Sequence, residues 1–264
     1  MLTDPLRIAL LHLAPRAADI AYNQRLVEQG IAIAAKAGAK WVVTPELATT
    51  GYTFAEIIGT DWIAIQPDAW LQDMCEMARR HEVAIFIGHV ERDQDRNTLH
   101  NSVFTIAASG ELLRQHRKIN TLRIGSEAWS TPGVNPTVIE LSPYGKVGIL
   151  VCADACSACI AARLKADGAR LLISAASWAP GLHGPNGEWE RITTLTGLPL
   201  FVCNRTGDDK IMSFAKAESV VAHQGRRLFS MTSAQSTVFL VEWSLQADNL
   251  HSQPVRLDIP VSTD

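Results

Sequence analysis

Three polar side chains stand where short apolar runs of the sequence end. Glu46 ends the segment WVVTPE, Lys118 ends LLRQHRK, and Cys152 ends KVGILVC just before a predicted helix. Side chains at the carboxyl ends of strands converge on one edge of a sheet, which is where α/β folds place their sites. The three residue types would form a reactive group if they share that edge.

Their chemistry is complementary. A cysteine thiolate is a strong nucleophile, and a helix N-terminus lowers the pKa of such a thiol. A carboxylate can take the thiol proton and pass it to a leaving amine, and a lysine can neutralise the oxyanion at an attacked carbonyl or nitrile carbon. Taken singly, each also has an ordinary explanation as a solvated carboxylate, a surface charge or a small buried hydrophobe. Spacing alone leaves open whether they meet.

The segments that must position these residues alternate along the chain between the hydrophobic period of a strand and that of a helix. Mixed periods, with both hairpin turns and helical crossovers, predict an α/β fold that contains mixed sheets. We predict one domain over 1–264, with 246–264 as an extended C-terminal arm because it has little helical pattern. The predicted strands are 7–13, 41–44, 83–90, 99–107, 111–117, 137–141, 146–152, 171–177, 200–204, 219–223, 227–230 and 238–243, and the predicted helices are 23–36, 69–81, 156–166 and 188–195.

Composition narrows the class of protein. The 264 residues carry 24 Lys and Arg against 27 Asp and Glu, and 47% are hydrophobic. This balance, without a basic run, argues against nucleic acid as a partner. The longest apolar stretch, 147–162, is interrupted by Asp154 and is shorter than the roughly 20 residues that a membrane span needs. Five cysteines, an odd number, indicate reduced thiols rather than a secreted disulfide framework. We therefore expect a cytoplasmic protein without a membrane partner.

The segments around the three residues resemble the nitrilase superfamily, the carbon–nitrogen hydrolases with a Glu-Lys-Cys triad. TPELATTGY resembles the family's Pro-Glu segment, and HNSVFTIAASGELLRQHRK resembles the run that ends in its lysine. GSEAWSTPG resembles a following glutamate element, and KVGILVCADACSACIAARLKADGARLLISAASW resembles the nucleophile segment. The resemblance places the triad on Glu46, Lys118 and Cys152 and a second glutamate on Glu127. It covers residues from about 5 to 243 in order.

This resemblance implies a four-layer α-β-β-α sandwich with two mixed sheets, usually dimerised, so we expect a homodimer or a higher homo-oligomer. It also implies two chemical steps. Cys152 attacks the substrate carbon and expels ammonia or an amine, and water then hydrolyses the thioester. Glu46 would act as general base and then acid, while Lys118 and the backbone N–H of Ala153 would hold the oxyanion. Glu127 would position the substrate amine or support the lysine.

Three further residues have roles that the sequence leaves open. Tyr52 and Trp178 are candidate walls of the substrate pocket, although core packing explains Trp178 equally well because aromatic side chains dominate buried area. Asp154 is better explained as a helix cap or as the partner of an arginine than as a catalytic group.

The substrate class is suggested by the residues after the nucleophile. Family members that hydrolyse nitriles tend to carry Trp and then Glu there, whereas Cys152 is followed by Ala153 and Asp154. This places the chain nearer the amidase-like branches, so we predict a thiol hydrolase that acts on a small amide without a cofactor. A nitrilase and an N-carbamoyl hydrolase are the alternatives on the same triad.

Two interpretations from other classes of protein remain. Cys152, Cys156 and Cys159 have the C-x3-C-x2-C spacing of radical SAM enzymes, which hold an iron–sulfur cluster on three thiolates. Packing of two small helical residues into a core explains Cys156 and Cys159 better, and a zinc site lacks an obvious fourth ligand, so we predict no metal. The second reading is a non-catalytic scaffold with the hydrolase fold, against which the intact triad argues.

Overall fold

Two β-sheets form the centre of the molecule, within the residues that the computed structural model describes, 5–122, 125–181 and 184–260. The first sheet contains β1 (Leu6–His12), β2 (Trp41–Val43), β3 (Ala84–Arg92), β4 (Leu99–Ile106), β5 (Leu112–Arg117), β12 (Thr237–Ser244), β13 (Asn249–Leu250) and β14 (Val255–Asp258). The second contains β6 (Thr137–Leu141), β7 (Gly145–Val151), β8 (Leu171–Ala176), β9 (Leu200–Asn204), β10 (Ser219–His223) and β11 (Arg226–Met231).

Both sheets mix parallel and antiparallel pairs. The first has the order β13-β12-β1-β2-β3-β4-β5, with β14 also paired to β12, and the second has the order β11-β10-β9-β8-β7-β6. Strands β1, β2 and β3 run parallel, as do β7, β8 and β9. The flanking hairpins β4–β5 and β6–β7 are antiparallel. The carboxyl ends of the parallel strands in each sheet therefore lie at one edge of that sheet.

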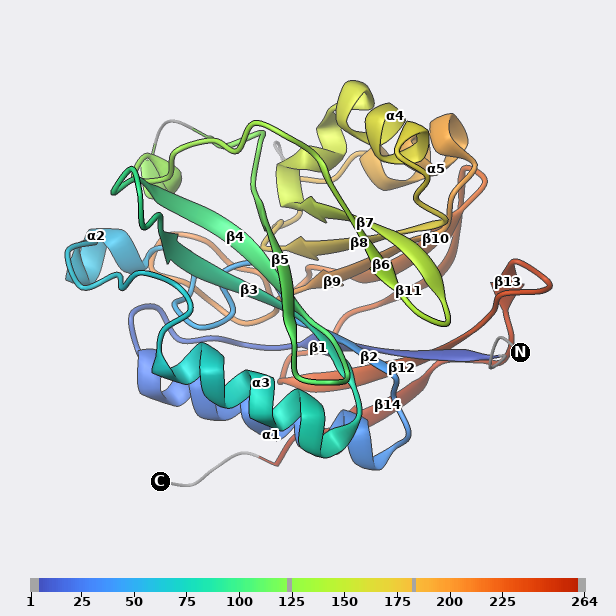
Figure 1. Cartoon of the computed structure of the whole chain (residues 1–264), viewed down its shortest axis with the longest axis horizontal. Helices are drawn as coiled ribbons and strands as arrows, with labels where there is room; N and C mark the ends of the chain where they lie inside the picture. The colour runs from blue at the N-terminus through green and yellow to red at the C-terminus, as the bar shows by residue number, and fades with distance from the viewer. Residues whose placement is uncertain (1–4, 123–124, 182–183, 261–264) are drawn as a thin grey trace.

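Helices cover the outer face of each sheet (Figure 1). Helices α1 (Ile20–Lys36) and α3 (Ala69–His81) lie against the first sheet, and α4 (Ala158–Ala166) and α5 (Glu188–Thr196) lie against the second. Asp19 and Asp68 cap α1 and α3 by accepting hydrogen bonds from N–H groups in the first turn. The expected four-layer α-β-β-α sandwich with two mixed sheets is confirmed.

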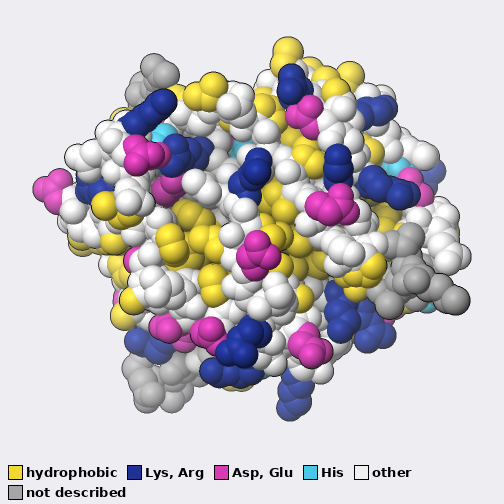
Figure 2. All heavy atoms as spheres, in the orientation of Figure 1, with side chains coloured by type: hydrophobic (Ala, Val, Ile, Leu, Met, Phe, Trp, Pro, Cys, Tyr) yellow, Lys and Arg dark blue, Asp and Glu magenta, His cyan; other side chains and the backbone are white. Residues whose placement is uncertain are grey.

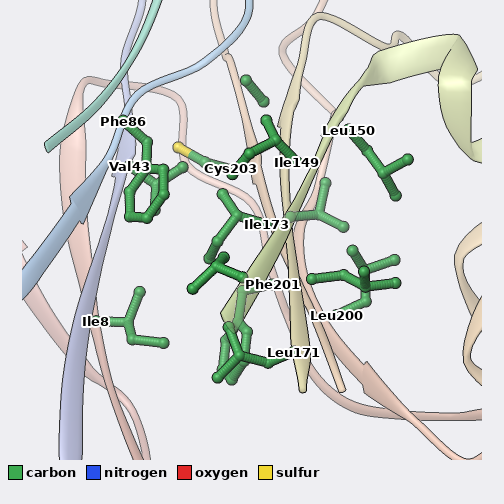
Figure 3. Close-up of a cluster of buried hydrophobic side chains, with 14 of the residues drawn as sticks. Ile8, Val43, Phe86, Ile149, Leu150, Leu171, Ile173, Leu200, Phe201 and Cys203 are labelled. Atoms are coloured by element: carbon green, nitrogen blue, oxygen red, sulfur yellow. The ribbon is translucent and has the colours of Figure 1, made fainter. Parts of the chain in front are cut away.

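The space between the sheets is filled by apolar side chains (Figure 3). Ile8, Val43 and Phe86 of the first sheet face Ile149 and Ile173 of the second, and all are fully buried. Strands covered on both sides by other layers carry near-continuous apolar runs. This explains why β7 (GKVGILV) and β8 (LLISAA) show no alternation of apolar and polar residues. This rigid core fixes the positions of the strand ends.

Most predicted elements lie within a few residues of their observed bounds. The helix expected from residue 156 begins at Ala158, because a 3-10 helix, η2 (Cys152–Cys156), comes first and Ser157 caps α4. The short helix α2 (Phe54–Ile58) and the 3-10 helix η1 (Gly125–Glu127) were not expected, since neither is long enough to show a period.

The segment expected as a C-terminal arm contains β13 and β14, both paired with β12, while 261–264 lie outside the described residues. The assignment of one domain stays a prediction. None of the helices in the described ranges is both long and apolar enough to cross a membrane. On the face shown in Figure 2, basic and acidic side chains are interspersed.

Candidate active site

The three residues singled out by the sequence lie together at the strand ends. Glu46 follows β2 after a two-residue connection, Lys118 follows β5 directly, and Cys152 follows β7 directly. All three are buried, with exposed fractions of 0%, 1% and 6%. Both sheets thus contribute to a shared interior: the first sheet places the carboxylate and the amine there, and the second sheet places the thiol.

Lys118 lies between two carboxylates. Its Nζ is 2.8 Å from Oε1 of Glu46 and 2.7 Å from Oε1 of Glu127, which lies on η1 and is 1% exposed. Burial alone would lower the pKa of Lys118, but Glu46, Cys152 and Glu127 together raise it well above its ordinary value. The lysine therefore remains a cation. Burial raises the pKa of Glu127, although Lys118 opposes that shift.

Cys152 is held in an unusual conformation. Its φ of 47° lies in the left-handed region, which costs a residue with a Cβ about 1–2 kcal/mol, and such strain gathers at functional sites. Burial and then the charge of Glu46 raise the pKa of Cys152 well above its ordinary value, against Lys118 and the Ser177 N–H. The expectation that a helix N-terminus lowers this pKa is wrong, because burial outweighs the short η2. The thiol is protonated at neutral pH and needs a base.

Two further residues complete the arrangement, and neither was predicted from the sequence. The Ser177 N–H donates to Oε2 of Glu46 at 2.9 Å, and its hydroxyl donates to the Glu46 carbonyl at 2.8 Å. Asn101 Nδ2 donates to Oε1 of Glu46 at 2.8 Å and to Oε1 of Glu127 at 3.0 Å. The signal for Asn101 was its place in the HNS motif, and the signal for Ser177 was its position after an apolar strand.

Comparison with known proteins decides the family. The model of the carbon–nitrogen hydrolases matches residues 7–242. The chain belongs to the carbon–nitrogen hydrolase family. It is a member of the nitrilase superfamily and an enzyme that acts on carbon–nitrogen bonds, as the triad motifs predicted.

Relatives agree with this assignment over nearly the whole hydrolase. A probable nitrilase of Schizosaccharomyces pombe is 24% identical over 260 residues, covering 94% of this chain and 91% of the relative. A nitrilase of Pyrococcus abyssi is 27% identical, covering 86% and 85%. An amidase from Nesterenkonia superposes with a TM-score of 0.81 at 23% identity, covering 94% and 93%. At that identity, the last comparison shows the shared fold.

Asp154 ties the nucleophile segment of the hydrolase to the segment that carries Lys118. Its Oδ2 accepts from the Val151 N–H and contacts Nε2 of His116, both at 3.0 Å, and its Oδ1 accepts from the N–H groups of Ile119 and Asn120. The carboxylate is fully buried. Asp154 therefore caps the turn at the nucleophile, and its side-chain partner is a histidine where an arginine was the alternative expected.

A glycine lets the backbone of Glu46 approach the neighbouring strand. A Cβ built on Gly88 of β3 would lie 2.1 Å from the carbonyl oxygen of Pro45 and 2.9 Å from Cα of Glu46. Both obstructing atoms belong to the backbone, so a larger residue must displace the strand end that presents the carboxylate. Gly88 is thus part of the reason that Glu46 can reach Lys118.

We expect Gly88→Ala to destabilise the hydrolase by about 1–3 kcal/mol, the usual cost of overpacking, and to lower kcat by displacing Glu46. Urea unfolding and steady-state kinetics measure the two effects. Ile87→Val is the matched control, since Ile87 lies on the opposite face of β3, in the core under the helices. Gly88→Ala with normal kcat would contradict this account of how Glu46 is placed.

The candidate pocket residues lie at different depths. Tyr52 is 7% exposed, and after burial the charge of Glu46 is the next largest influence that raises its pKa, so its phenol lies near the triad. Trp178 is partly buried, and its ring packs edge-on against that of Trp189 at 5.7 Å. Ala153 is the second residue of η2, where N–H groups lack partners within the helix.

The other two cysteines of the C-x3-C-x2-C run lie apart from this interior. Cys156 and Cys159 are exposed, whereas Cys152 is buried. The expected packing of both residues into the core is therefore wrong, because Cys156 ends η2 and Cys159 lies on the exposed side of α4. Over the described ranges, no cluster of three or more His, Cys, Asp or Glu side chains is arranged to hold a metal ion.

Proposed function

We propose that this hydrolase cleaves the C–N bond of a small amide through a thioester on Cys152. The observation that carries the proposal is the burial of a carboxylate, a lysine and a second carboxylate beside a cysteine whose thiol is protonated. A buried thiol becomes a nucleophile only when a base takes its proton. Glu46 is the carboxylate whose charge acts most strongly on that thiol.

The proposed reaction moves one proton at a time. Glu46 takes the thiol proton, and the sulfur attacks the carbonyl carbon to form a tetrahedral oxyanion. Lys118 and the Ala153 N–H donate to that oxyanion, and each such donor is worth about 2.7–4 kcal/mol of barrier. Protonated Glu46 then gives its proton to the leaving nitrogen, ammonia departs, and the thioester remains.

Hydrolysis of the thioester reverses these roles. Glu46 takes a proton from water, the hydroxide attacks the thioester carbon, and the sulfur leaves as a thiolate that recovers its proton from Glu46. Glu127 supports this cycle by sharing the charge of Lys118. Chemical precedent comes from a fold neighbour, because a variant of the Nesterenkonia amidase carries the acetamide moiety of fluoroacetamide covalently at its active-site cysteine.

Ammonia release across small amides, nitriles and N-carbamoyl amino acids tests the substrate class, with Cys152→Ala as the blank. We expect Cys152-dependent release from amides. Release from nitriles alone would favour the nitrilase alternative, which the names of the Schizosaccharomyces pombe and Pyrococcus abyssi relatives keep in view. Release from N-carbamoyl compounds alone would assign the third alternative, and release from none would favour the non-catalytic scaffold.

The homodimer and the cytoplasmic location stay predictions. Light scattering on the purified chain tests the first, and we expect a mass of twice 28.8 kDa.

A further inference from the structure

One amide nitrogen is shared by the two carboxylates that flank Lys118. Asn101 lies near the start of β4, and its side chain is fully buried. Its Nδ2 has two N–H groups, and it lies 2.8 Å from Oε1 of Glu46 and 3.0 Å from Oε1 of Glu127. The Lys118 Nζ lies at the same two oxygens. Two donors and two acceptors thus alternate in a closed ring.

The ring accounts for the donors and acceptors around the base. Each carboxylate receives Lys118 and Asn101 on Oε1, while Oε2 receives a backbone N–H, from Ser177 for Glu46 and from Leu122 for Glu127. The ammonium group has three N–H donors. Two of them point at Oε1 atoms, so one is left for an oxyanion. The neutral Asn101 amide is a second donor to each Oε1, and it helps the two carboxylates to share the single cation of Lys118.

The backbone of Asn101 joins the same elements. Its carbonyl accepts from the Lys118 N–H at 2.8 Å, and its N–H donates to the Ser130 hydroxyl at 3.1 Å. The Ser130 N–H donates in turn to the Glu127 carbonyl. These bonds survive a change of side chain, so a substitution at Asn101 can remove the amide while leaving the surrounding backbone connected.

We propose that Asn101 is a positioning residue that holds Glu46 and Glu127 in register on Lys118, so that Glu46 serves as the base for Cys152. This rests on the function proposed above. The amide contributes no charge, and its Oδ1 is buried without a hydrogen-bond partner among the residues described. Leaving a buried acceptor unpaired costs stability, which fits a side chain placed for its N–H groups.

Two substitutions remove those N–H groups differently. Asn101→Leu keeps the approximate shape and removes both donors, and Asn101→Asp keeps the shape and adds a third carboxyl group. Loss of a hydrogen bond to a charged group predicts about a 10- to 100-fold fall in kcat. We expect KM to change much less, because the Asn101 Nδ2 is bonded to Glu46 and Glu127. We expect Asn101→Asp to fall further, since a third acceptor repels the pair.

Ser102→Ala is the matched control. Ser102 is the next residue of β4, and its side chain points to the opposite face of the sheet. Its hydroxyl donates to the buried Glu91. It therefore loses one buried hydrogen bond to a carboxylate outside the site. We expect Ser102→Ala to lower stability to a similar degree while keeping kcat and KM.

A substrate-independent readout is the rate at which iodoacetamide alkylates Cys152, followed by mass spectrometry of its peptide against pH. The charged and titratable groups that act on the pair are Glu46, Glu127, Lys118, Cys152, Tyr52 and Arg205. Burial already raises the pKa of Glu127, and removing the Asn101 donor from that carboxylate raises it further. The acid limb of the alkylation profile should therefore move to higher pH in Asn101→Leu, and the rate at neutral pH should fall.

The outcomes separate the two proposals. Normal kcat and an unmoved alkylation profile in Asn101→Leu, matching Ser102→Ala, would overturn the role of Asn101 even if amides are hydrolysed. If no substrate of the panel turns over but alkylation still depends on Asn101, the positioning role stands and the proposed function fails. Equal losses in Asn101→Leu and Ser102→Ala would reduce Asn101 to a structural residue.

Discussion

Replacing Cys152 with serine is expected to lower turnover by about 10⁴-fold or more while the fold is retained. When catalytic residues act as a unit, the remaining residues cannot compensate for the loss of the nucleophile. A serine hydroxyl is also a far weaker acid than a thiol, so Glu46 could not produce the attacking anion as readily. Steady-state ammonia release, together with the circular dichroism spectrum, measures activity and fold on the same sample.

Cys156→Ser is the control for this substitution. Cys156 lies four residues further along the chain, and its thiol is exposed, so its loss should leave turnover and stability unchanged. Retained turnover in Cys152→Ser, beside an unchanged spectrum, would remove Cys152 from the proposed mechanism.

Replacing Lys118 with methionine is expected to destabilise the protein by about 3–5 kcal/mol and to abolish turnover. Removal of one partner from a buried ion pair leaves uncompensated charge in the interior. Here two carboxylates, Glu46 and Glu127, would face each other with only the Asn101 amide between them. Urea unfolding measures the change in the free energy of unfolding.

The direction in which the stability of Lys118→Met changes with pH is a sharper test. Without the cation, a buried carboxyl group takes a pKa above its unfolded value of about 4.3. The folded state then binds more protons than the unfolded state, so stability falls as pH rises through the interval between the two pKa values. Relative to the parent protein, Lys118→Met should therefore be less destabilised at pH 5 than at pH 7.5.

Lys146→Met is the control, since Lys146 is exposed and its loss should change stability by less than about 0.5 kcal/mol. A destabilisation by Lys118→Met that is the same at both pH values would contradict the buried carboxylate pair.

The sequence located the reactive groups because strand ends are readable from apolar runs. Glu46 and Cys152 follow such runs, and Lys118 follows the second strand of a hairpin, a strand that begins with two leucines; the strands bring these ends to one edge. What the sequence could not show was which partners surround them. Asn101 lies inside a strand rather than at its end. Its side-chain contacts, with Glu46 after β2 and Glu127 on η1, depend on segments far apart in the sequence, which local patterns do not determine.

The sequence also did not predict the backbone conformation of Cys152. The sequence indicated a helix after the strand, whereas the chain forms a 3-10 turn with Cys152 in the left-handed region, held by Asp154. Burial of the thiol depends on both sheets at once. A pKa argument from the helix alone therefore gave the wrong direction, and the raised pKa makes the general base that the sequence analysis assigned to Glu46 more important.

The measurement that tests the central claim most directly is partitioning of the acyl group between water and hydroxylamine. A primary amide and the methyl ester of the same acid would be compared, both with Cys152 intact. If both pass through one thioester on Cys152, the ratio of hydroxamate to acid must be the same for the two leaving groups, and that is the result we predict. A ratio that depends on the leaving group would show that no common acyl-enzyme forms and would contradict the account.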